Sequence, residues 1–168
     1  AGQICAGANV GSDEQMQQLT DKIKEMTRSI PLAAEELAAM AAAGAKLGVP
    51  LENLEQFVLL SAQMATAFNM NADQAGEAVA KLSNVFALPL ERVRDLGDAI
   101  NTLGNNMAAK ESAIVDVLTR IGGTTKQFGL TAEQAAALAA SMLSLGVSAE
   151  VAGTGINAIL SKNVFKIF

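Results

Sequence analysis

Histidine is absent from the sequence, and Cys5 is the only cysteine. This inventory excludes an internal disulfide, a Cys/His zinc site and a histidine general base. Tryptophan and tyrosine are absent as well, so only 4% of the residues are aromatic although 51% are hydrophobic. Alanine supplies much of that apolar content, which favours helices that pack closely through small side chains.

Clustered positive charge is also missing. The 168 residues include 12 Lys or Arg and 17 Asp or Glu, and the net charge is −5. Because proteins that track the phosphates of nucleic acids need clustered Lys and Arg, no specific nucleic-acid partner is expected. Residues 1–11 lack the basic start and the continuous apolar core of a signal peptide.

What the sequence does contain is one short pattern that occurs five times. In the copy at residues 47–52, Gly48 suits the left-handed conformation that ends a helix, Pro50 suits the start of the next helix, and Glu52 places a negative charge in its first turn. The other copies start at Phe68, Phe86, Phe128 and Leu145, with Asn69, Ala87, Gly129 and Gly146 at the left-handed position and Asn71, Pro89, Thr131 and Ser148 at the start position. The pattern therefore predicts five tight turns between helices.

Small residues raise further expectations. Ala87 fits the pattern poorly because its Cβ disfavours positive φ, so we expect a different cap at that turn. The pair Gly122-Gly123 is expected to end a helix. Other glycines lie inside helical segments, where they indicate close approach of a neighbouring helix or, alternatively, hinges: Gly44, Gly76, Gly97, Gly153 and Gly155.

The segments between the turns have helical periodicity or a strongly helix-forming composition. They predict an all-α fold of about eight short helices joined by tight turns, packed as a compact helical bundle without strands. The expected helices span residues 12–28, 31–47, 51–68, 72–86, 90–103, 108–121, 131–145 and 148–161. Residues 1–11 are expected to be a flexible N-terminal segment, 12–161 the helical core domain, and 162–168 a C-terminal tail or a cut boundary. The chain lacks an initiator Met and is expected to be a segment of a longer protein.

Two stretches resemble functional motifs by their letters. Residues 153–158 match the dinucleotide fingerprint, but they follow a helix start instead of a strand, so no cofactor is expected. Asp95 and Asp98 are one helical turn apart, as paired catalytic carboxylates would be, but Arg92 and Arg94 beside them favour a solvated face. No enzymatic activity, catalytic residue or metal site is predicted.

Three regions are candidates for contact with other molecules. Asp98, Asn101 and Asn105 share one face if the segment is helical, and this face is a candidate surface for a partner chain. Residues 135–149 carry no charge, which favours a buried pair of helices at the end of the chain; the alternative is a membrane-active, pore-forming module. The alanine-rich residues 31–47 would suit self-association, which is left open.

Longer stretches of the sequence indicate a family. They are residues 30–37 (IPLAAEEL), 70–86 (MNADQAGEAVAKLSNVF), 96–106 (LGDAINTLGNN) and 152–157 (AGTGIN). Together these stretches resemble the core region of tail tape measure proteins from tailed phages and prophages. The likeness covers residues 27–160.

The resemblance implies a structural role in virion assembly. A tape measure protein sets the length of the phage tail, occupies the lumen of the virion tail, is assembled in the bacterial cytoplasm, and leaves ahead of the DNA, with membrane contact during ejection. The implied partners are the tail tube protein, tail assembly chaperones and baseplate hub proteins. A chain of 168 residues is too short to measure a whole tail alone. The repeated turns become candidate joints at which a folded domain is drawn out, with Gly48, Pro50, Asn69, Pro89, Gly129 and Gly146 as their structural residues.

Overall fold

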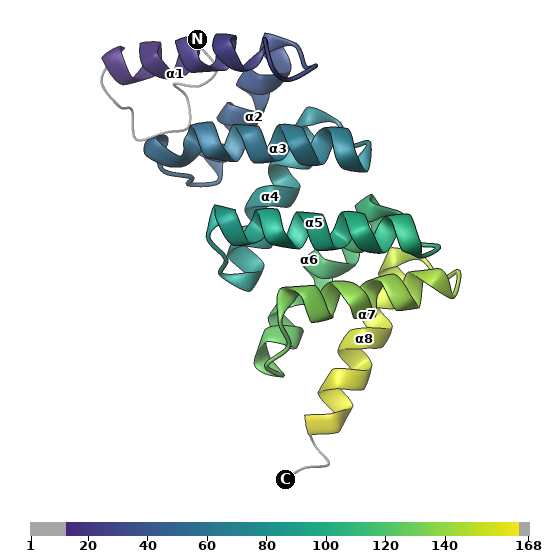
Figure 1. The fold of residues 1–168 in the computed structure, drawn as a ribbon. Helices are drawn as coiled ribbons and strands as arrows, with labels where there is room; N and C mark the ends of the chain where they lie inside the picture. Colours follow the sequence, from purple (N-terminus) through teal and green to yellow (C-terminus); the bar gives the residue numbers. More distant parts are fainter. Residues whose placement is uncertain (1–12, 165–168) are drawn as a thin grey trace. The chain divides into compact units, whose positions relative to one another are not determined.

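A computed structural model describes residues 13–164, and over that range the chain is all-α (Figure 1). The described residues form eight α-helices and one short 3₁₀ helix, which confirms the predicted fold class and number of helices. The elements are α1 (Asp13–Met26), α2 (Ala34–Lys46), η1 (Leu51–Asn53), α3 (Leu54–Phe68), α4 (Ala72–Phe86), α5 (Leu90–Asn106), α6 (Glu111–Gln127), α7 (Ala132–Ser144) and α8 (Ala149–Val164). The predicted N-terminal segment and residues 165–168 of the predicted tail lie outside the described residues.

The chain divides into two compact units, of which the first ends at Ala80 and the second begins at Lys81. The division falls within α4. Helices α1 to α3 and the first part of α4 belong to the first unit, and the end of α4 and helices α5 to α8 belong to the second. The single helical core expected for residues 12–161 stays a prediction.

The first unit is built around the alanine-rich helix α2, which packs against α1 and α3. Gly44 of α2 lies so close to the Phe57 ring of α3 that a Cβ at this glycine would come within 2.7 Å of the ring. On α4, a Cβ at Gly76 would lie 3.5 Å from the Cβ of Ala43. Small residues therefore let α2 approach two neighbouring helices, as its composition predicts.

In the second unit, each helix packs against the next helix and the next but one. Helix α5 contacts α6 and α7, α6 contacts α7 and α8, and α7 contacts α8. Figure 1 shows α5 and α7 side by side. This contact pattern is typical of stacked helical hairpins. Most side chains enclosed by these helices are apolar, and Val93, Leu96, Ile100, Leu118 and Ile121 are completely buried.

The turns that lead from one helix pair to the next have a regular spacing along the sequence. Gly48, Ala87 and Gly129 follow one another at intervals of roughly 40 residues, which is the length of a two-helix repeat in several repeat families. The sequence pattern predicts the single turns, but the two-helix period becomes visible only when the helices are paired.

Some helices begin or end away from the predicted positions. Helix α2 begins at Ala34 instead of Pro31, and the Ala33 N–H donates a 2.9 Å hydrogen bond to the Glu36 carboxylate just before the first turn. Helix α5 continues through the predicted break to Asn106. Local side-chain hydrogen bonds of this kind decide helix ends that periodicity leaves open.

Gly122 and Gly123 do not end a helix, so that prediction is wrong. Both lie inside α6, which continues to Gln127. Gly122 is buried, and a Cβ there would lie 1.9 Å from a methyl carbon of Val85 and 3.1 Å from the ring of Phe86, both on α4. The chain needs glycine at this position because a side chain would occupy the space where α4 packs on α6, not because the backbone must turn.

This contrast predicts opposite effects at neighbouring positions. Gly122→Ala should destabilise the fold by about 2 kcal/mol, because the added methyl group forces buried side chains to move. Gly123→Ala is the matched control. A Cβ at Gly123 would have no contact within 4 Å among the described atoms, so this change should stabilise α6 by about 1 kcal/mol through helix propensity. Urea unfolding followed by circular dichroism at 222 nm measures both, and equal shifts of the same sign would contradict the packing described.

Helix joints and candidate assembly surfaces

Five helices end next to a residue with positive φ. Gly48, Gly129 and Gly146 have φ of 84°, 70° and 84°, Asn69 has 51° and Ala87 has 54°. All five residues are exposed, and all five occupy the left-handed position of the repeated sequence pattern. We refer to these five turns as the helix joints.

Backbone hydrogen bonds that run back across the left-handed residue close four of the joints, and at the fifth the Gly146 N–H donates to the Leu143 carbonyl oxygen at 2.9 Å. At the first joint the Val49 N–H donates to the Gly44 carbonyl oxygen at 2.9 Å, and the Gly48 N–H donates to that of Ala45 at 3.1 Å. Leu130 makes the equivalent bond at the Gly129 joint, at 3.0 Å. These bonds satisfy carbonyl groups that the end of a helix leaves unpaired, and they fix the direction in which the chain leaves.

The joint at Ala87 has the same conformation as the other four, so the expectation of a different cap there is wrong. The Leu88 N–H donates to the Ser83 carbonyl oxygen at 2.9 Å, and the Ser83 hydroxyl donates to the Leu88 carbonyl oxygen at 2.7 Å. These two bonds offset the cost of a Cβ at positive φ. Sequence reasoning missed Ser83 because nothing in the repeated pattern marks its position.

At three joints the start residue is a side-chain cap of the next helix. Asn71 and Thr131 accept hydrogen bonds from the N–H groups of Gln74 and Gln134, at 2.8 and 3.2 Å. The two glutamine side chains accept hydrogen bonds from the cap N–H groups in return. Ser148 caps α8 through its hydroxyl oxygen. The pattern therefore places a hydrogen-bonding cap wherever the start residue has a side chain that accepts.

Pro50 and Pro89 lie one residue before their helices, as the expected spans 51–68 and 90–103 imply, and are not the first helical residues themselves. Their φ values are −57° and −66°, but their ψ values are 145° and 160°, so each is the extended residue just outside the helix. Proline suits this position because its φ is fixed and it has no N–H group to leave unpaired.

Asp98, Asn101 and Asn105 lie on one face of α5, as their spacing predicts. Asp98 and Asn105 are exposed and Asn101 is half-buried. The Asn105 amide donates to the Asn101 side-chain oxygen at 3.3 Å. This polar face offers donors and acceptors to another chain, and it lacks the burial that adapts a carboxylate to acid–base catalysis.

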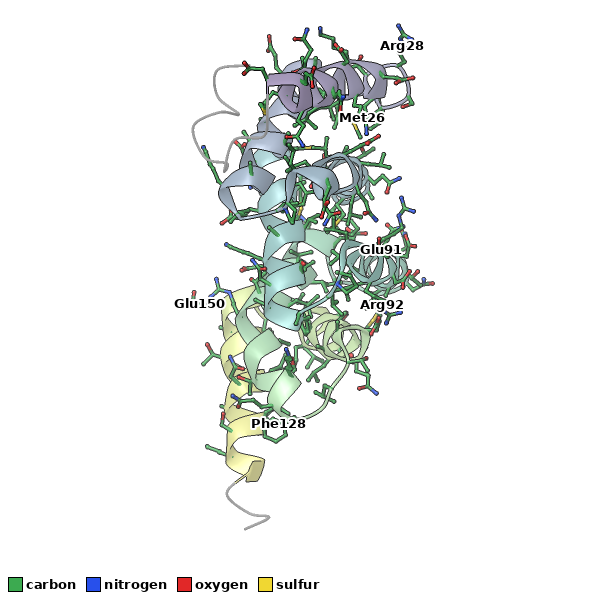
Figure 2. All side chains as sticks on the ribbon, turned by 90° about the vertical axis from the view of Figure 1, so that its left-hand side faces the viewer. Met26, Arg28, Glu91, Arg92, Phe128 and Glu150 are labelled. Atoms are coloured by element: carbon green, nitrogen blue, oxygen red, sulfur yellow. The ribbon has the colours of Figure 1, made fainter. Side chains whose placement is uncertain are left out.

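Asp95 does not form a carboxylate pair with Asp98, because it binds Arg92 instead, at 3.0 Å. The other branch of the Arg92 guanidinium binds Glu133 of α7, also at 3.0 Å. Arg92 thus links α5 to α7 at the surface, where Figure 2 shows it. Both ion pairs are partly exposed, so each contributes less than about 1 kcal/mol.

The last two helices are buried to different degrees. Helix α7 buries an alanine face against α5 and α6, formed by Ala135, Ala136, Ala139 and Ala140. Helix α8 leaves Val151 and Ile159 56% exposed, and Leu145 at the preceding joint is 76% exposed. The predicted buried pair is therefore wrong for α8, which packs on α6 and α7 along one side and exposes Val151 and Ile159 on the other. None of the helices within residues 13–164 combines the length and hydropathy needed to cross a bilayer.

The stretch that resembles a dinucleotide fingerprint lies in the middle of α8, not in a loop between strand and helix. A Cβ at Gly153 would lie 3.1 Å from the Arg120 side chain of α6, and the Asn157 amide donates to the Arg120 carbonyl oxygen at 3.2 Å. These residues therefore pack α8 against α6. Within residues 13–164, Asp and Glu side chains form no group of three or more that could hold a metal ion.

Sequence reasoning also missed a hollow of about 150 Å³ in the first unit, because its lining comes from two separate segments. The lining is mainly polar and includes Gln15 and Gln18 of α1 and Glu52 of η1. Lys22 and Glu55, which form an ion pair, also line it. The paired charges neutralise each other, so the hollow has no evident reactive group.

Packing contacts, caps and joints account for the residues described above, and this arrangement defines a class: an all-α structural protein. The chain belongs to the phage-related minor tail protein family, whose sequence model matches residues 20–164.

Two curated relatives have the printed name "Probable tape measure protein". The one from Halomonas phage phiHAP-1 is 38% identical over 113 residues, which are 67% of this chain and 13% of that protein. The one from Escherichia phage P2 is 22% identical over 148 residues, which are 88% of this chain and 18% of that protein. The chain thus spans less than a fifth of either relative. No solved structure matches it.

Substitutions at the left-handed residues test the conformation of the joints. Gly48→Val should lower the stability by about 2 kcal/mol, because a β-branched residue is strained at positive φ. Asn69→Gly is the matched control and should leave the stability within about 0.5 kcal/mol, because glycine adopts the left-handed conformation freely. Thermal unfolding should show a fall in Tm of about 5 °C for the valine variant. An unchanged Tm for Gly48→Val would mean that the joint is not built as described.

Proposed function

We propose that the chain works as a helical segment of a tail tape measure protein, with a structural role in setting tail length. The observation that carries this proposal is the family match over residues 20–164, together with two relatives named as tape measure proteins. Because the chain corresponds to a small part of each relative, the role of the whole protein passes to this chain only as part of the proposal.

The joints suggest how such a segment is extended. The five left-handed residues are exposed, and a side chain at Gly48, Gly129 or Gly146 would have no contact within 4 Å among the described atoms. A side chain at these positions would therefore not hinder a change of φ and ψ, which requires the loss of the capping hydrogen bonds and of the apolar contacts between the two helices that the joint connects. Rigid helices linked in this way can be drawn out without being unwound, which suits a protein that lies along the lumen of a virion tail.

The proposed partners are other tail components: the tube protein, the tail assembly chaperones and the baseplate hub. The polar face of Asp98, Asn101 and Asn105 supports this part of the proposal, because exposed carboxylate and amide groups suit reversible contacts made during assembly. Self-association through α2 is less well supported, since α2 packs against α1 and α3 within its own unit.

Tail length tests the proposal. Deletion of residues 88–129 from the gene in its own phage or prophage removes one helix pair from joint to joint. At 1.5 Å per residue, the tail should shorten by about 60 Å if these residues lie along the tube as helix. Electron microscopy of negatively stained particles measures the length. Gly123→Ala is the control, because it keeps the number of residues and should leave the tail unchanged. Tails of normal length in the deletion variant would refute the proposed function.

The polar face of α5 has its own test. Replacing Asp98, Asn101 and Asn105 together by Ala should weaken co-purification with at least one tail protein by about tenfold, as expected when several interfacial hydrogen bonds are lost. The control replaces Gln17, Asp21 and Glu25, which are exposed on α1. Circular dichroism establishes that both variants fold. Equal binding by the wild type and the α5 variant would show that this face is not a contact surface.

A further inference from the structure

One helix joint differs from the other four in the residue that adopts positive φ. Glycine or asparagine occupies four of the left-handed positions, and Ala87 occupies the fifth, with φ of 54°. Glycine has no Cβ, and asparagine tolerates this conformation better than other residues do. Alanine has neither property, so the α4–α5 joint is the most strained of the five.

The same joint has a side-chain hydrogen bond that the residues at the equivalent positions of the other joints do not make. Ser83 lies five residues before Leu88, and the two residues are bonded twice: Leu88 N–H to the Ser83 carbonyl oxygen, and the Ser83 hydroxyl to the Leu88 carbonyl oxygen. At the equivalent positions of the other joints, Gly44, Ala65 and Met142 have no side-chain donor, and the Thr125 hydroxyl donates backwards to carbonyl groups of its own helix.

We propose that the Ser83 hydroxyl is a latch that holds the strained α4–α5 joint closed, and that this joint opens before the joints at Gly48, Asn69 and Gly129 when the latch is released. Strain and latch act on the same few atoms, so the side-chain hydrogen bond offsets the strain where it arises. Those three joints are closed by the same backbone bond and have glycine or asparagine at the left-handed position. The latch does not depend on the proposed function. If the chain is a tape measure segment, which rests on that function, extension of the chain would begin at Ala87.

Amide hydrogen exchange measured by NMR on the 168-residue chain tests the latch at the Leu88 N–H. The Val49, Met70 and Leu130 amides, which make the equivalent bonds, serve as internal references. Ser83→Ala should speed exchange at Leu88 about fivefold, the value of one ordinary hydrogen bond. Ala87→Gly should slow it about tenfold by removing the strain. The reference amides should keep their wild-type rates in both variants.

A matched variant moves the strain to a joint without the latch. Gly129→Ala should speed exchange at Leu130 about tenfold and leave Leu88 unchanged. The proposal is overturned if Ser83→Ala leaves the Leu88 rate unchanged, or if Ala87→Gly does not slow it. It is also overturned if every amide of α5 to α8 shifts equally, since the joint would then open only with the whole fold. If Ser83→Ala does not fold, Ala87→Gly and Gly129→Ala still decide the matter.

Discussion

A helix that ends beside a residue with positive φ directs the following chain away along a fixed path, because two backbone hydrogen bonds close back over that residue. A left-handed residue occurs at five of the connections in the described chain, and the backbone bond that closes across it occurs at four of them. This geometry sets where these helices stop, and the residue two positions later sets where the next one starts. The lengths of the intervening helices, and the packing of each helix on its neighbours, depend on these joints.

The helices also depend on close packing through small residues. With few aromatic side chains, the helices gain contact area by approaching one another closely, and glycines at the contact points permit it. Gly44 meets the ring of Phe57 in the first unit, and Gly122 meets Val85 in the second. Such interfaces tolerate little added volume. The left-handed residues of the joints are different in this respect, because they are exposed and a side chain at Gly48, Gly129 or Gly146 would meet no described atom within 4 Å.

These properties are compatible with a structural role in a phage tail. Many polar side chains of the described residues take part in caps, in exposed ion pairs and in the α5 face. The family relationship carries the proposed role, and the exposed joints are compatible with it.

The sequence by itself determined the helical class, the number of helices and the five joints, because caps and left-handed residues act within a few residues of one another along the chain. Only the tertiary structure decided what Gly122 and Ala87 do. Glycine serves either to turn the backbone or to leave room for a neighbour, and the two uses look alike until that neighbour is in place. Alanine at positive φ contradicts local preference, and it is tolerated because Ser83, on the preceding helix turn, bonds across the joint.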